Sequence, residues 1–222
     1  MQHITHALSL LLLGLLSTVA LAQDAGLNNG IIEIQHTWAH VHYQLPEDQQ
    51  DAAYAHVEEM ADELITRYPG HAEPLVWKAI VLSTYAGAKG GLGALSMVRE
   101  ARDLLEQAEK IDPDTLDGSI YTSLGSLYYQ VPGWPLGYGD DKKAEIFLKK
   151  ALAINPTGID PNYFYGDFLY RKNRYPEALS YLEKAMHAPP RPDRPLADQG
   201  RREEIQVIIA RIQDKTKVKA RS

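Results

Sequence analysis

The 222-residue sequence predicts an all-α protein, a right-handed α-solenoid of stacked helical hairpins. Three units with one internal spacing lead to this prediction, because alanine, leucine, alanine and proline recur at offsets 0, 4, 7 and 12. The units cover residues 101–113, 144–156 and 178–190. The first three positions share one helix face, where two small side chains admit a neighbouring helix closely. The proline cannot continue a helix, so each unit is predicted to be the second helix of a hairpin, ending at its own stop.

The spacing between the units is typical of tetratricopeptide repeats (TPR). The last two units begin 34 residues apart, which is the TPR period, and the first two begin 43 residues apart. In the last hairpin, Asp160 and Pro161 fit the cap and first residue of the preceding helix. Gly166 in that helix matches Gly125 in the hairpin before it. A helical bundle would also show alanine and leucine at these offsets, but the recurring proline and the tandem phase favour a TPR-like solenoid.

The chain divides into four predicted parts. They are a signal peptide (1–22), an N-terminal helical pair that is a degenerate repeat or a cap (23–69), TPR repeats with long intra-repeat loops (70–195), and a C-terminal capping helix with a basic tail (196–222). The leader contains a ten-residue apolar run, which is shorter than the roughly 20 residues that span a bilayer. Ala20-Leu21-Ala22 follows as a cleavage signature. We therefore expect a periplasmic protein with no transmembrane anchor after cleavage, and a leader retained as an anchor is the alternative.

Composition narrows the classes of function. The chain has no cysteine, which excludes disulfides, thiolate metal sites and lipid attachment at a cysteine. Its formal net charge of −6 argues against a nucleic-acid partner, because such binding requires a basic footprint. The sequence shows no nucleophile elbow, catalytic triad order or paired acid motif. We therefore expect a protein that is not an enzyme and needs no cofactor.

Two glycine-rich segments interrupt the repeat between its helices. They are residues 86–95, which contain Lys89, and residues 130–141, which contain Trp134 and Tyr138. Equivalent loops of adjacent repeats lie side by side on one edge of a solenoid, so we expect the two segments to meet. Glycines let the backbone approach a ligand closely, and aromatic rings supply a rigid apolar wall. Lys89, Trp134 and Tyr138 are therefore candidate binding residues, and the alternative is that the aromatic rings only pack the loop onto the stack.

The concave face of the predicted solenoid supplies a second set of candidates. The first helices of the hairpins line that face, and the repeat positions concerned are occupied by Thr122, Ser126, Tyr129, Tyr163, Asp167, Tyr170 and Arg171. An aromatic groove of mixed polarity suits a peptide or a protein segment. The groove lacks the lysine and asparagine residues of TPR domains that clamp a carboxylate. The alternative is a row of ordinary half-exposed tyrosines.

A weak metal candidate lies near the N-terminus. Glu33, His36 and His40 share a helix face at three- and four-residue spacing, which metal ligands can use. The sequence contains no HExxH motif and no matching second pair. A polar helix face is the alternative.

The second half of the chain resembles a particular family. The segments LYYQVPGWPLGYGDDKKAEIFLKKALAINP, DPNYFYGDFL and AMHAPPRP resemble the T-component family of TRAP transporters, called TatT-like proteins. The resemblance implies a periplasmic helical-repeat helper that contacts a solute-binding protein and holds a hydrophobic solute. Members are commonly lipoproteins, and this chain departs from them because it has no cysteine to acylate.

Two main functions follow from these observations. The first is an exported, non-enzymatic interaction module that binds a partner protein or peptide through the groove and the loops. The second is an accessory or carrier for a small hydrophobic solute, with a pocket beneath Trp134 and Tyr138. A metal-binding protein is a remote third. A closed apolar cavity under the loops would favour the carrier, and an open groove would favour the interaction module.

Overall fold

The computed structural model describes residues 25–219, and the regular structure in this range is helical. The helices are residues 25–44, α2 (Glu47–Arg67), α3 (Ala72–Lys89), α4 (Gly91–Ile111), α5 (Thr115–Gln130), α6 (Asp141–Ile154), α7 (Ile159–Arg171), α8 (Tyr175–Met186) and α9 (Pro195–Lys219). The predicted signal peptide lies outside the described residues. Within residues 25–219, none of the helices is both long and apolar enough to cross a bilayer.

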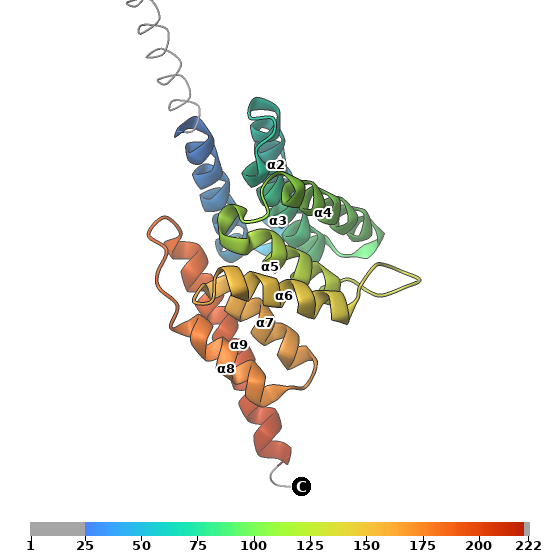
Figure 1. The fold of residues 1–222 in the computed structure, drawn as a ribbon, viewed down its shortest axis with the longest axis vertical. Helices are drawn as coiled ribbons and strands as arrows, with labels where there is room; N and C mark the ends of the chain where they lie inside the picture. Colours follow the sequence, from blue (N-terminus) through green and yellow to red (C-terminus); the bar gives the residue numbers. More distant parts are fainter. Residues whose placement is uncertain (1–24, 220–222) are drawn as a thin grey trace, which may run out of the picture.

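The helices form successive antiparallel pairs that stack side by side (Figure 1). Helix α3 packs on α4, α5 on α6, and α7 on α8, and α5 joins the neighbouring pairs by contacting both α3 and α7. The alanine and leucine positions of the three repeat units are fully buried between these helices. The predicted all-α, TPR-like solenoid of helical hairpins is therefore confirmed.

Two glycines show why the hairpins pack so closely. A Cβ atom on Gly125 would lie 2.6 Å from the Leu148 side chain, and one on Gly166 would lie 2.8 Å from the Leu182 side chain. Real Cβ contacts are not this short, so only glycine fits where the leucine of the second helix crosses the first. The same contact recurs in both hairpins, as the repeat spacing predicts.

The predicted loop over residues 86–95 is wrong. Helix α3 continues to Lys89 and α4 begins at Gly91, so Gly90 with φ 65° makes the corner between them. The segment contains no proline, and a glycine inside a helix costs only about 1 kcal/mol. Burial of the amphipathic faces of α3 and α4 outweighs that cost, and the two helices simply run longer than their counterparts.

The second predicted insertion is a real loop. Residues 131–140 separate α5 from α6, and this loop accounts for the longer spacing between the first two units. Asp140 caps α6, because its side chain accepts hydrogen bonds from the backbone N–H groups of Lys142 and Lys143 at 2.9 and 3.2 Å. The loop lies beside the α3–α4 corner (Figure 1). The Tyr138 hydroxyl donates to the backbone carbonyl of Val98 in α4.

Helix α9 has two roles, of which the sequence indicates one. Ile205, Ile208 and Ile212 are buried in the core shared with α7 and α8, as expected for a capping helix. The first turns of α9 instead contact the helix at residues 25–44. A Cβ atom on Gly200 would lie within 2.5 Å of the Tyr43 ring, and His42 Nε2 lies 3.5 Å from a Glu204 carboxylate oxygen. The first and last described helices therefore meet across the concave side.

Candidate ligand-binding cavity

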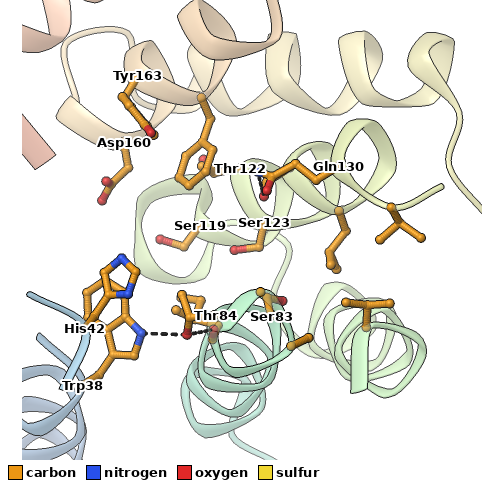
Figure 2. Close-up of a pocket in the computed structure, with 18 of the residues that line it drawn as sticks. Trp38, His42, Ser83, Thr84, Ser119, Thr122, Ser123, Gln130, Asp160 and Tyr163 are labelled. Atoms are coloured by element: carbon orange, nitrogen blue, oxygen red, sulfur yellow. Dashed lines mark hydrogen bonds between the residues drawn. The ribbon is translucent and has the colours of Figure 1, made fainter. Parts of the chain in front are cut away.

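A cavity of about 430 Å³ occupies the concave side of the solenoid (Figure 2). Its walls come from the helix at residues 25–44, from α3, α4, α5, α7 and α9, and from the start of the 131–140 loop. One wall is apolar and consists of Ile80, Ala86, Ala94, Leu95, Val98, Leu127, Val131 and Phe164. Because residues from both ends of the described chain line it, the cavity depends on the contact between the first helix and α9.

Small hydroxyl side chains form a second wall, where α3 faces α5 (Figure 2). Ser83 and Thr84 donate to the backbone carbonyls of Ala79 and Ile80 at 2.6 and 2.8 Å. Ser119 and Thr122 donate to carbonyls of their own helix at 2.6 and 3.2 Å. With their protons used in this way, the oxygens can still accept hydrogen bonds, and Thr84 accepts one from Trp38 Nε1 at 2.9 Å. The short side chains keep the space between the two helices open.

The end of the cavity beside α9 is charged. Asp160 accepts hydrogen bonds from Arg191 at 2.6 Å and from Arg201 at 2.9 Å. Burial would raise the pKa of Asp160, but the guanidinium groups of Arg191, Arg201 and Arg194 outweigh burial and hold the pKa well below its usual range. Arg201 also pairs with Glu204 at 2.5 Å. The carboxylates at this end are therefore ionised and hydrogen-bonded.

Arg194 lies at the same end and has a different environment. Its guanidinium lies over the Trp77 ring at 5.0 Å, and its closest carboxylate oxygen, on Asp160, is 4.0 Å away. Trp77, Ser119, Thr122, Asp160 and Arg194 also line a neighbouring hollow of about 390 Å³. This part of the wall is therefore shared by two adjoining spaces.

Three of the predicted concave-face residues line the cavity. They are Thr122 and Ser126 on α5 and Tyr163 on α7. Burial raises the pKa of Tyr163, so its hydroxyl stays protonated at neutral pH and can donate. The positions of these three residues in the repeat thus predicted part of the cavity wall.

Four predicted residues lie outside the residues that line the cavity. Tyr129, Asp167 and Arg171 bond to one another, with Tyr129 donating to Asp167 at 2.8 Å and Arg171 donating to Asp167 at 2.9 Å. Tyr170 packs beside Tyr175, with ring centroids 6.0 Å apart. These groups are occupied by contacts within the protein, and their role in binding a partner stays a prediction.

The candidate binding residues of the two glycine-rich segments have different environments. Tyr138 donates to the Val98 carbonyl at 2.6 Å and lies under the Arg102 guanidinium, whereas Trp134 is 91% exposed. Lys89 is exposed and lies 3.0 Å from the Tyr85 hydroxyl and 3.3 Å from Asp51. Tyr138 thus fastens the loop to α4, and Trp134 points away from the body of the protein.

The three weak metal candidates, Glu33, His36 and His40, do not form a metal site in the described part of the chain. His36 donates to the backbone carbonyl of Asp193 at 2.6 Å, and His40 bonds to the Gln44 side chain at 2.9 Å. Among residues 25–219, no three histidine or acidic side chains converge as metal ligands would. The shared helix face exists, but Glu33, His36 and His40 do not turn toward a common point.

Sequence reasoning missed the residues that the first helix and α9 bring to the cavity. Trp38 and His42 come from one helix and Arg201 and Glu204 from the other. Their patterns along the chain match ordinary helix faces, and only the meeting of the two helices makes them neighbours.

Comparisons with known proteins add little to these observations. No protein-family model matches the chain, and no curated protein matches it. Among solved structures, it is similar to a thermophilic TPR protein in Thermus thermophilus, with 18% sequence identity. The alignment covers 70% of this chain and 92% of that one, with a TM-score of 0.40. The assignment to a TPR-like solenoid therefore depends on the helix pairing and close packing described above.

Proposed function

We propose that this chain is an exported binding protein, without catalytic activity, that carries a small and largely apolar molecule in its concave cavity. The cavity is the observation that carries the proposal. Its volume of about 430 Å³ falls within the range of roughly 300–1,000 Å³ for small-molecule sites. An apolar wall faced by a few polar groups is also the usual composition of such sites.

The contact between the first helix and α9 favours a small molecule over a protein segment. An extended peptide needs a groove that is open along its length. Here the first helix and α9 meet across the concave side, and Tyr129, Asp167 and Arg171 are already bonded to one another. The carrier therefore fits the geometry better than the interaction module that binds through a tyrosine-lined groove.

The resemblance of the second half of the chain to T-components of TRAP transporters agrees with this proposal. It supports a periplasmic location and a solute that passes to or from a solute-binding protein. The predicted leader supports export. The proposed carrier would act as an accessory of TRAP-type uptake.

Native mass spectrometry of the mature protein, purified from cell envelopes, tests the proposal. We expect a bound small molecule on the wild type. Ser123→Trp should abolish it, because Ser123 lines the cavity between α3 and α5 and an indole would fill that space. Ser180→Trp is the matched control, since Ser180 lies on α8, away from the residues that line the cavity. Retention of the molecule by Ser123→Trp, or its absence from the wild type, would count against a carrier.

A protein partner that docks on the 131–140 loop is a second candidate function. Trp134 is 91% exposed and Leu136 is 64% exposed on this loop, which Tyr138 fastens to α4. An exposed tryptophan on a loop that is fastened to the body of the protein suits an interface anchor. The family resemblance implies a periplasmic solute-binding protein as the partner. Trp134→Ala should reduce cross-linking to such a protein and leave the small molecule in the cavity, whereas unchanged cross-linking would exclude this loop.

A further inference from the structure

Two buried hydrogen-bond donors beside the cavity have no acceptor. Within residues 25–219, neither Trp77 Nε1 nor Arg194 Nε has a hydrogen-bond partner. Burying such a group without a partner is costly, so native proteins seldom leave one in this state. Here the two groups belong to side chains that stack on each other. Their proximity indicates a place where an acceptor is supplied by a ligand.

Both side chains lie in the wall shared by the cavity and the neighbouring hollow. Ser119 and Thr122 from α5 line the same part, and their hydroxyl protons are donated to carbonyls of their own helix. The Arg194 side chain is 18% exposed. Both side chains are therefore close to space that a ligand can occupy, although Arg194 Nε and Trp77 Nε1 are themselves covered by protein atoms.

The charged side chains at this end of the cavity indicate which charge the hydrogen-bond acceptor of a ligand should carry. Asp160 is hydrogen-bonded by Arg191 and Arg201, and Glu204 by Arg201. In the described part of the chain, Arg194 approaches Asp160 only to 4.0 Å, beyond hydrogen-bond distance. Burial lowers the pKa of Arg194 to about 10, so the side chain still carries its charge at neutral pH. An acceptor with one negative charge would satisfy it.

We propose that the carried molecule is a monocarboxylate, whose carboxylate binds at Arg194 and Trp77 while its apolar part lies along the wall formed by α3, α4 and α5. This inference rests on the proposed carrier function and names its ligand class. A planar carboxylate matches the paired N–H groups of a guanidinium. A doubly charged phosphate fits less well. Among the arginines described at this end, only Arg194 has no hydrogen-bonded carboxylate, and Asp160 is close enough to repel a second charge.

Isothermal titration of the mature protein with decanoate and decanamide tests the ligand class. The two probes share one chain and differ in the charge of the head group. We expect the wild type to prefer decanoate by at least about tenfold, which is the scale of one charge-assisted hydrogen bond. Arg194→Gln should remove this preference and leave decanamide binding within twofold. Arg211→Gln, an exposed arginine on α9, should behave as the wild type.

Two further variants keep the test informative. Trp77→Phe retains the aromatic ring and removes the indole N–H, so decanoate binding should weaken severalfold and decanamide binding should not change. Without any probe, Arg194→Gln should melt no lower than the wild type, because it removes a buried cation whose Nε has no hydrogen-bond partner. A lower melting temperature without probe would instead assign Arg194 to the stability of the fold.

The outcomes separate the two proposals. Equal binding of decanoate and decanamide by the wild type, with Ser123→Trp blocking both, would overturn the carboxylate and leave the carrier standing. Tighter binding of decyl phosphate than of decanoate would replace the carboxylate with a phosphate. Failure of every probe, together with no bound molecule on the purified wild type, would overturn both proposals.

Discussion

The α3–α4 corner and the α5–α6 corner occupy equivalent positions in neighbouring hairpins, and both are rich in glycine. At the first corner, both helices continue to within one residue of each other, and Gly90 makes the turn. At the second corner, residues 131–140 leave the helix altogether. Pro132 and Pro135 occur in the second segment, while the first has no proline. Glycine weakens a helix by about 1 kcal/mol and proline by about 3 kcal/mol, so proline decided which corner became a loop.

The glycines of the two corners also serve different purposes. A Cβ atom on Gly139 would lie 2.0 Å from the Val131 carbonyl oxygen, and one on Gly137 would lie 2.4 Å from the Pro132 carbonyl oxygen. Gly87, Gly90 and Gly93 would meet no atom within 4 Å. The loop needs its glycines so that the two sides of its backbone can touch. The α3–α4 corner needs only the positive φ of its turn residues, which glycine adopts without strain.

Gly139→Ala should have the largest effect on stability among the corner variants. The added methyl group meets backbone atoms of Val131, Pro132 and Gly133, which cannot move without opening the loop. We expect a loss of about 2–3 kcal/mol in the free energy of unfolding, as for other overpacked sites. Urea denaturation followed by circular dichroism measures it. A loss below about 0.5 kcal/mol, the usual range of surface substitutions, would mean that the loop is loosely packed.

Tyr138→Phe should have an intermediate effect. It removes the hydrogen bond from the Tyr138 hydroxyl to the Val98 carbonyl, for an expected loss of about 1 kcal/mol. Trp134→Ala is the contrast within the same loop, and because Trp134 is almost fully exposed its stability should stay within about 0.5 kcal/mol of the wild type. Equal losses for the two variants in parallel denaturation curves would contradict the division between a packed and an exposed aromatic residue.

Gly87→Ala should have the smallest effect, with the opposite sign. Gly87 is helical within α3, and a Cβ atom there would meet open space. Alanine therefore adds helix propensity without a clash, and we expect a gain of about 0.5 kcal/mol. Differential scanning calorimetry should show a slightly higher melting temperature. A decrease would indicate that residues 86–89 are not held in a helix, as the sequence first suggested.

The candidate site was predicted in part. Thr122, Ser126 and Tyr163 line the cavity, because the TPR register places them on the inner face of the first helices. Tyr129 and Asp167 follow from the same register but bond to each other instead. Register determines which face a residue occupies. It does not determine which neighbouring side chain that residue will bond to.

The sequence by itself determined most of the helices, the proline stops of the three repeat units and the equivalent positions of Gly125 and Gly166. These features depend on local backbone preference and on the 3.6-residue helical period, both of which a short segment records. Only the tertiary structure decided that the first helix and α9 meet, and that Arg194 stacks on Trp77 in the wall of the concave cavity. The meeting of these two helices depends on the small rotations between successive hairpins, which add up along the solenoid. The sequence of a single repeat does not reveal their total.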